Sequence, residues 1–378
     1  MARSKKENLN FIDLFSGCGG LSVGLELAGH SCKLGVDFNS DAIETFKHNH
    51  KNSQSYCGDI QKLTSTKLKK LIDPIEIDMV VGGPPCQGFS TIGKGQAADQ
   101  RNTLFKQFVR IVRICDPKIL IMENVTGLLA SKNKKTLEAI FREFEKQGYT
   151  MEARVLSSEE YGVPEIRRRT IIIGTKNCCA PIYPEVTHGK RGNLKISTVG
   201  DAFSELISSE GEILNHNVET ATIKNELDRK RLAKIPEGKG IRYEKDELAY
   251  LPKKLRFDID WATIPEKRFR QIKYQRLDTK LPSPTILTSR TSYYHPTENR
   301  YLTVREAASC QSFPPDFEFK GSLTSQFRQI GNAVPPLLGF ALGLAAKQMV
   351  SQRRSKVLTA SKKKFVKNAF NYQKQITA

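Results

Sequence analysis

The stretch Phe11-Ile-Asp-Leu-Phe-Ser-Gly-Cys-Gly-Gly-Leu21 decides the fold, because an apolar run there ends in a glycine-rich turn. Glycine lets a backbone turn sharply and approach a ligand closely. A helix that starts beyond such a turn offers free N–H groups. We therefore predict a strand, a ligand-binding turn and a helix, although a purely structural turn fits this motif alone equally well. Ser22 takes the third place of G-x-G-x-x-G, which disfavours a dinucleotide ligand.

Short apolar runs alternate with segments of helical periodicity outward from this turn. The predicted strands are 10–15, 32–36, 77–81, 118–122, 150–156 and 170–174, and the predicted helices are 41–50, 102–114 and 135–147. This alternation predicts an α/β fold with a doubly wound, largely parallel sheet. Asp37 closes the second run, and Gly58-Asp59-Ile60 stands where a third strand ends. Acidic side chains at that sheet edge can bind ribose hydroxyls, which favours an adenosine-type ligand.

The segment Val81-Gly-Gly-Pro-Pro-Cys-Gln-Gly-Phe-Ser90 places a cysteine on a loop directly after an apolar run. The two prolines stiffen the approach to Cys86, and the glycines around it leave space. A thiolate there is a strong nucleophile if nearby positive charge lowers its pKa. Gly88, Gly93 and Gly95 make the following segment a plausible mobile lid. An arbitrary loop cysteine is usually inert, but the Pro-Pro-Cys-Gln turn favours the nucleophile.

Two charged groups belong to neighbouring predicted strands. Glu123-Asn124-Val125 ends the predicted strand that follows Cys86, so the Glu123 carboxyl is expected at the same sheet edge as Cys86. Burial there would raise the pKa of Glu123, which suits a proton donor. A helix-capping Glu-Asn pair is the alternative, and the residues alone favour it. Arg167 and Arg169 share one face of an extended chain and are suited to a base carbonyl or a phosphate, or else form a solvated basic edge.

Composition narrows the class of partner. The 378 residues include 60 Lys and Arg against 40 Asp and Glu, a formal net charge of +20. This indicates a polyanionic partner, most commonly nucleic acid, although an ordinary basic protein also fits. Eight cysteines without a CxxC pair predict neither a disulfide scaffold nor a bound metal. The first residues lack the apolar run of a signal peptide, and the most apolar segment, near 337–350, is too short to span a membrane. We therefore expect a cytoplasmic protein without a membrane span, and we expect it to be a monomer.

The amino-acid composition and periodicity of the chain change after Gly174. Residues 176 to about 275 are polar, basic and irregular, and they contain the single Trp, Trp261. One loop of that length is improbable in a compact domain, so we predict a second, smaller domain. We place the catalytic domain at 1–175, completed by about 320–350, the second domain at 176–315 and a basic tail at 351–378. From 347 onward the chain has nine basic and no acidic residues, which predicts a helix and then a disordered or DNA-contacting tail.

In this order, the motifs resemble those of the DNA cytosine carbon-5 methyltransferase family, in its prokaryotic modification-methylase type. The likeness covers 10–175 and 274–345, and it continues in His295-Pro296, in Leu302–Pro314 and in Gln329-Ile-Gly-Asn-Ala-Val-Pro-Pro336. The resemblance implies a Rossmann-like methyltransferase sheet and a target-recognition domain in the middle region. It also implies methyl transfer from S-adenosyl-L-methionine to carbon 5 of a cytosine flipped out of a specific double-stranded DNA sequence.

The resemblance also implies roles for individual residues. Cys86 resembles the nucleophile that adds to carbon 6 of cytosine, and Glu123 resembles the residue that contacts ring nitrogen 3. Arg169, with Arg167 beside it, is similar to the arginine that binds the base carbonyl. The implied cofactor residues are Phe15, Gly17, Gly19, Gly20, Leu21, Asp37, Phe38, Asp59, Ile60 and Pro84, with Leu104 and Asn332 at the outer wall of the pocket.

Two further features come from the same resemblance. Ser283-Pro-Thr-Ile286 resembles the segment near the target base, and the C-terminal helix is expected to fold back onto the cofactor domain. Glu165 stands where the family has Gln. We interpret this difference as a peripheral change that leaves Arg167 and Arg169 in register.

Two other functions stay open at this point. A tRNA cytosine-5 methyltransferase of the same architecture would use identical chemistry, although the long middle region and the strong basicity favour duplex DNA. A catalytically silent DNA-binding protein of the same fold is disfavoured because Cys86, Glu123 and Arg169 are all present. About ten residues precede the first strand, so we expect no added regulatory domain. By analogy, the enzyme belongs to a restriction-modification system, with a cognate restriction endonuclease that acts separately.

Overall fold

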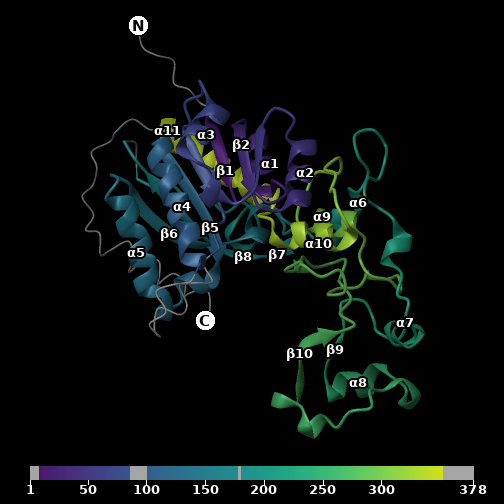
Figure 1. Ribbon diagram of the computed structural model, residues 1–378. Coiled ribbons are helices and arrows are strands. Elements are labelled where there is room, and N and C mark those ends of the chain that lie inside the picture. The colour runs from purple at the N-terminus through teal and green to yellow at the C-terminus, as the bar shows by residue number, and fades with distance from the viewer. Residues whose placement is uncertain (1–7, 86–99, 178–179, 352–378) are drawn as a thin grey trace. The chain divides into compact units, whose positions relative to one another are not determined.

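The computed structural model describes residues 8–85, 100–177 and 180–351 (Figure 1). Within these residues the chain divides into two compact units. Unit 1 contains the residues up to Tyr161, then Arg167–Thr187, and the residues from Ala333 onward. Unit 2 contains Gly162–Ile166 and His188–Asn332. The functions of the two units stay predictions. Of the predicted tail at 351–378, residues 352–378 lie outside the described residues.

Unit 1 is built on a seven-stranded sheet with the order β3-β2-β1-β4-β5-β8-β6. Its strands are β1 (Asn10–Leu14), β2 (Ser31–Asp37), β3 (Gln54–Cys57), β4 (Met79–Gly82), β5 (Ile119–Val125), β6 (Thr150–Ser157) and β8 (Arg168–Thr175). Neighbours pair in parallel from β3 to β5, and β8 runs antiparallel between β5 and β6. The predicted doubly wound, largely parallel sheet is confirmed.

Helices cover both faces of this sheet (Figure 1). They are α1 (Gly20–Leu27), α2 (Ser40–Asn49), α3 (Ser65–Ile72), α4 (Gln100–Cys115), α5 (Lys134–Glu145) and α11 (Pro336–Ser351). Successive strand residues point to opposite faces. Ile12 accordingly packs in the cluster that contains Phe108 of α4, whereas Phe11 belongs to a second cluster, with α1 and α11. Burial on both faces explains why the strands read as continuous apolar runs.

Helix α11 lies directly against α1. A Cβ atom added at Gly24 would collide with the Pro336 carbonyl oxygen, and it would lie 2.5 Å from the Phe340 backbone nitrogen and 2.6 Å from the Gly339 carbonyl carbon. Only a hydrogen atom fits between the two helix backbones. The C-terminal helix therefore completes one face of unit 1, and the helix that begins at the glycine-rich turn depends on it for packing.

Unit 2 consists of short elements around an aromatic core. Its elements are β7 (Glu165–Ile166), α6 (Val199–Ser204), α7 (Glu226–Leu232), β9 (Ile241–Tyr243), α8 (Glu244–Tyr250), β10 (Arg268–Lys273), β11 (Ser283–Pro284), α9 (Val304–Cys310) and α10 (Leu323–Asn332). Trp261, Tyr274 and Tyr294 are buried together in this core. The Trp261 indole N–H donates to the Glu247 carboxylate at 2.7 Å, so the one polar atom of the ring is satisfied.

One helical stretch of the described residues, Leu323–Ser351, is long and apolar enough by composition to cross a membrane. It comprises α10 and α11 with residues 333–335 between them. Within its most apolar window, 61% is buried inside the protein, as in the core helix of a globular protein.

Candidate active site

The turn between β1 and α1 has an unusual backbone. Phe15, Gly17 and Gly19 adopt the left-handed region, with φ of 61°, 55° and 95°. This conformation costs a residue with a Cβ atom about 1–2 kcal/mol, so Phe15 is strained and is held by its surroundings. A Cβ atom added at Gly17 would meet no atom within 4 Å. The turn therefore borders open space, and the predicted ligand-binding turn has the room that it needs.

Asp37, at the end of β2, holds this turn in place. Its Oδ2 accepts a hydrogen bond from the Gly17 N–H at 2.9 Å, and its Oδ1 accepts one from the Asn39 N–H, also at 2.9 Å. Burial raises the pKa of Asp37, and the hydrogen bonds from Asn39 and Gly17 partly offset that rise. A carboxylate offers about four acceptor positions, so the group can still accept a hydrogen bond from a ligand hydroxyl. Beside it, Phe38 is 77% exposed.

The other residues predicted to bind the cofactor fall in several places. Asp59 caps the short helical turn Ile60–Lys62 by accepting from the Gln61 N–H at 2.9 Å. Gly20 and Leu21 form the buried first turn of α1, Ile60 is buried in the core, and Leu104 is half-buried on α4. Asn332 is the exposed last residue of α10, in unit 2. A contribution of Asn332 to the pocket thus stays a prediction.

Glu123 and Arg169 form an ion pair at the end of β5. In the antiparallel ladder Glu123 is opposite Ile171, which makes Arg169 its diagonal neighbour on the same face. The Arg169 Nε lies 2.8 Å from the Glu123 Oε1, and the two side chains are only 17% and 14% exposed. Burial raises the pKa of Glu123, and Arg169 and Arg167 partly offset the rise. Arg167 is almost fully buried and lies close enough to Glu123 to act on its pKa, but a common face of the two arginines stays a prediction.

Asn124 anchors the chain that leads to Cys86. Its side-chain amide donates to the Pro84 carbonyl oxygen at 2.8 Å, and both residues are buried. A Cβ atom added at Gly83 would lie 3.2 Å from the Glu123 Oε2, so this glycine leaves space beside the carboxylate. The capping alternative fails because the helical turn after β5 has no side-chain cap. Cys86 and the predicted lid glycines lie outside the described residues.

Glu165 overturns the interpretation of a peripheral change. Its side chain is completely buried, and its Oε1 accepts a hydrogen bond from the Ile286 N–H at 2.5 Å. Strands β7 and β11 pair in parallel beside it, and the Thr285 hydroxyl donates to the Ile166 carbonyl at 2.8 Å. The carboxylate therefore anchors the 283–286 segment within unit 2. Spacing along a sequence does not show which distant backbone group a buried side chain will bind.

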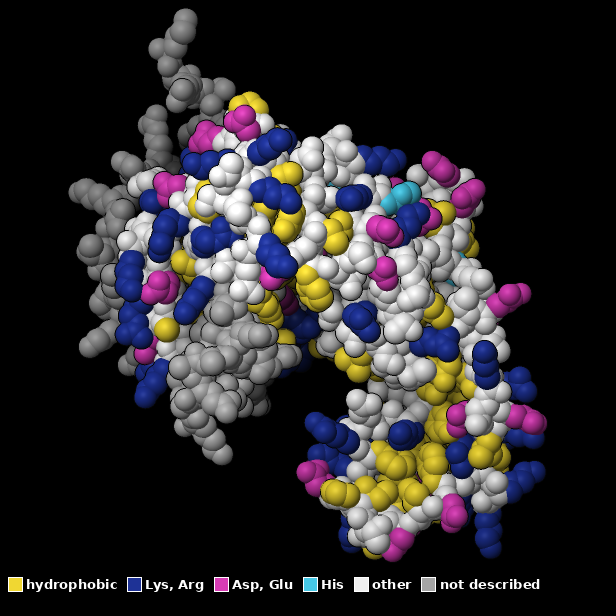
Figure 2. Space-filling view, in the orientation of Figure 1, with side chains coloured by type: hydrophobic (Ala, Val, Ile, Leu, Met, Phe, Trp, Pro, Cys, Tyr) yellow, Lys and Arg dark blue, Asp and Glu magenta, His cyan; other side chains and the backbone are white. Residues whose placement is uncertain are grey.

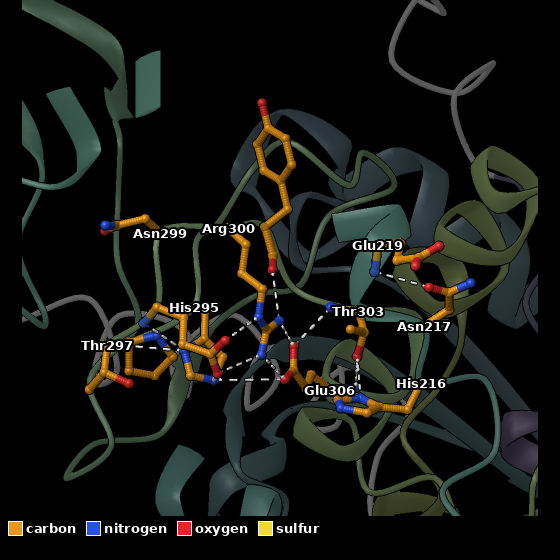
Figure 3. Close-up of polar contacts among 12 residues, drawn as sticks. His216, Asn217, Glu219, His295, Thr297, Asn299, Arg300, Thr303 and Glu306 are labelled. Atoms are coloured by element: carbon orange, nitrogen blue, oxygen red, sulfur yellow. Dashed lines mark hydrogen bonds and ion pairs between the residues drawn. The ribbon is translucent and has the colours of Figure 1, made fainter. Parts of the chain in front are cut away.

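The motif between His295 and Glu306 forms a buried polar network in unit 2 (Figure 3). The Arg300 guanidinium makes two contacts with the Glu306 carboxylate, at 2.7 and 2.8 Å. The Thr303 N–H donates to the same carboxylate at 2.8 Å, and the His216 Nδ1 lies 3.0 Å from the Thr303 hydroxyl. Burial would raise the pKa of Glu306, but Arg300 and Thr303 outweigh it and lower that pKa below its ordinary value. This motif stabilises unit 2.

Comparison with known proteins now identifies the family. A sequence profile of the family described as C-5 cytosine-specific DNA methylase matches residues 9–348. The chain belongs to this family. The protein is therefore a DNA (cytosine-5) methyltransferase, as predicted, and neither the tRNA enzyme nor the silent DNA-binding protein is supported. The family uses S-adenosylmethionine as its methyl donor.

Individual relatives agree with this family over most of their length. The type II methyltransferase M1.HphI of Haemophilus parahaemolyticus is 36% identical over 349 residues, which cover 90% of this DNA methylase and 87% of the relative. M.NgoFVII of Neisseria gonorrhoeae is 35% identical over 347 residues, with coverage of 88% and 85%. A solved structure of a candidate DNA modification methyltransferase, encoded within an Escherichia coli prophage, has a TM-score of 0.69 at 25% identity, covering 91% of this chain and 100% of that one.

Proposed function

We propose that this DNA methylase binds S-adenosyl-L-methionine at the carboxyl edge of the unit 1 sheet and methylates cytosine through a covalent bond to Cys86. The observation that carries the proposal is the half-buried Glu123–Arg169 ion pair beside the anchored Pro84 carbonyl. That arrangement places an acid of raised pKa and a fixed cation next to the chain that enters Cys86.

The residues at the glycine-rich turn fit the cofactor. Asp37 retains acceptor capacity for a ribose hydroxyl, and the exposed Phe38 ring offers an apolar surface for an adenine base. Asp59 and the open space at Gly17 complete the expected pocket. When bound, S-adenosylmethionine supplies an electrophilic methyl group. The residues of this chain hold the cofactor and orient it toward the target base.

The protein groups act on cytosine in a defined order. Carbon 5 of the free base is a poor nucleophile, and addition of the Cys86 thiolate to carbon 6 turns the ring into an enamine-like species that is reactive at carbon 5. Glu123 donates a proton or hydrogen bond to nitrogen 3 as charge develops there, and Arg169 holds the base carbonyl. After methylation the hydrogen on carbon 5 leaves as a proton, and the Cys86 thiolate is expelled.

The partner is double-stranded DNA, and we assign the choice of target sequence to unit 2. The net charge of +20 supports binding to the phosphate backbone, which should weaken steeply as salt rises. The relatives are named type II methyltransferases, which supports a modification enzyme paired with a separate restriction endonuclease. Such an enzyme acts on cellular DNA, so we place it in the bacterial cytoplasm. We also propose that it is a monomer.

Trapping with 5-fluorocytosine tests the covalent step. Sequencing of methylated positions in DNA co-expressed with the protein first identifies the target, and a duplex then carries fluorine on carbon 5 of that cytosine. Fluorine cannot leave as a cation, so the enzyme should remain bound to DNA through denaturing electrophoresis, provided that S-adenosylmethionine is present. Mass spectrometry should place the base within residues 82–95.

Two variants test which cysteine forms the covalent adduct with DNA. Cys86→Ala should abolish the adduct. Cys57→Ala is the matched control, because Cys57 is an exposed free thiol in the described part of the chain, and this variant should trap DNA as the wild type does. An adduct of equal yield on Cys86→Ala would refute the assignment of the nucleophile.

A further inference from the structure

The two-stranded antiparallel sheet of β9 and β10 contains a large bulge. Arg268 pairs with Tyr243 and Lys273 pairs with Ile241, so residues 269–272 of β10 face Arg242 alone. Bulges bend a strand and redirect its side chains. In a regular strand the side chains at 269 and 272 would point to opposite faces.

Both ends of this bulge are anchored in the core of unit 2. The Phe269 ring packs against Phe257 and Trp261, with centroid distances of 5.3 and 4.7 Å. Ile272 lies against Gly240 so closely that a Cβ atom on the glycine would collide with it. Tyr274, the next residue after β10, is buried at a left-handed φ of 51°. The backbone is thus held on both sides of residues 270 and 271.

The two residues between the anchors both reach the protein surface. Arg270 and Gln271 are both exposed, and neither makes a hydrogen bond or ion pair within the part of the chain that the structure describes. The neighbouring cations are already engaged: the Arg268 Nε lies 2.6 Å from the Glu266 carboxylate, and the Lys273 Nζ lies 5.7 Å from the Phe269 ring centroid. The bulge therefore presents two consecutive, uncommitted side chains on a rigid base.

We propose that Arg270 and Gln271 read base edges in the major groove of the target duplex. The inference rests on the assignment of sequence choice to unit 2 made above, and it names the residues that make the choice. The major groove admits a two-stranded β-ribbon. An arginine there pairs with O6 and N7 of guanine through two hydrogen bonds, and a glutamine pairs likewise with N6 and N7 of adenine. Arg270 thus specifies a guanine, and Gln271 specifies an adenine.

The surroundings of the bulge suit a nucleic-acid partner. Figure 2 shows Lys and Arg side chains, with Asp and Glu side chains among them, around the part of unit 2 that carries β9 and β10, next to a group of hydrophobic side chains. Cations beside a reading pair contact phosphates and set its register, while base contacts specify sequence. Glu266 and Lys267, just before β10, both have a left-handed φ, of 57° and 48°. Such strain is concentrated at ligand-binding segments, where the surrounding structure maintains it.

Single-base substitution of the duplex tests the proposal. Once the wild-type target is mapped, methylation kinetics are measured on that duplex and on duplexes that change one base pair at a time. Arg270→Ala should reduce discrimination at one G·C position, and Gln271→Ala at one A·T position, each by about 5- to 150-fold. Arg270→Lys should lose the same discrimination, because lysine keeps the charge but lacks the planar fork. Arg229→Ala, which removes an exposed arginine of α7 in the same unit, should leave discrimination unchanged.

The outcomes separate this proposal from the proposed function. If Arg270→Ala lowers the rate equally on every duplex and Arg270→Lys restores that rate, Arg270 contacts a phosphate. If discrimination is unchanged in both alanine variants, Arg270 and Gln271 do not read the sequence. Either result overturns the proposal while the 5-fluorocytosine adduct still forms. Failure of the wild type to form that adduct would count against the covalent mechanism instead.

Discussion

Gly24→Ala should destabilise unit 1, even though alanine is the better helix former. Gly24 lies within α1, where replacing glycine by alanine gains about 1 kcal/mol in helix propensity. The added methyl group, however, would lie within 2.6 Å of backbone atoms of α11. Ordinary contacts need well over 3 Å, and a helix backbone cannot rotate away as a flexible side chain can. The two helices must therefore separate.

The expected cost follows from these two terms. Overpacking of a close-packed core costs typically 1–3 kcal/mol and sometimes more. Because backbone atoms of three residues are involved, we expect about 3 kcal/mol, which leaves a net destabilisation of about 2 kcal/mol after the propensity gain. For a unit of this size, that corresponds to a melting temperature lower by roughly 4–8 °C.

Thermal unfolding followed by circular dichroism measures the effect. Gly127→Ala is the matched control, because a Cβ atom there meets nothing within 4 Å, and its melting temperature should stay near that of the wild type. If Gly24→Ala is as stable as the wild type or more so, helix propensity alone governs the site, and the close contact of α1 with α11 is refuted.

Three shorter predictions concern the site and unit 2. Asp37→Asn leaves only one acceptor oxygen for two backbone N–H groups, so S-adenosylmethionine affinity should fall by about 1.5–3 kcal/mol; unchanged affinity in titration calorimetry would count against the role of Asp37. Asn124→Ala frees the Pro84 carbonyl, and the single-turnover methylation rate should fall about tenfold; an unaltered rate would show that this anchor does not position the nucleophile. The pKa of Glu306 is lowered from 4.5, so its ion pair stabilises the fold above that pH and is lost as pH falls through the lowered value. Glu306→Gln should therefore unfold at lower urea than the wild type near neutral pH, with a difference that shrinks in acid; a difference independent of pH would contradict the ion pair.

Periodicity predicted the sheet of unit 1 well because its strands are buried on both faces. The order of the strands and the antiparallel direction of β8 could not be predicted, since periodicity carries no information on which strands are neighbours. Alternation alone predicts a common face for Arg167 and Arg169. It does not predict the ion pair of Glu123 with Arg169, because that pair depends on the register between β5 and β8.

Residues that act through distant partners were the least predictable. Asn124 was predicted only as part of a strand end, whereas its partner Pro84 lies 40 positions earlier in the chain. The bulge around Arg270 has no signature in the sequence, because it depends on how Phe269 and Ile272 pack. These contacts are tertiary, and a single sequence records the residues but not which of them meet.

The chain passes between the two units four times, and one visit to unit 2 is only Gly162–Ile166. Glu165 in this short piece binds Ile286, which belongs to the long piece, His188–Asn332. The coding sequence for unit 2 is therefore divided between two separate stretches of the gene. A recombination event that imports the long piece alone joins a foreign 283–286 segment to the resident Glu165. If unit 2 chooses the target sequence, as we propose, a new specificity is inherited intact only when both gene fragments are transferred together. The exception is a recipient whose residue at position 165 already suits the imported 283–286 segment.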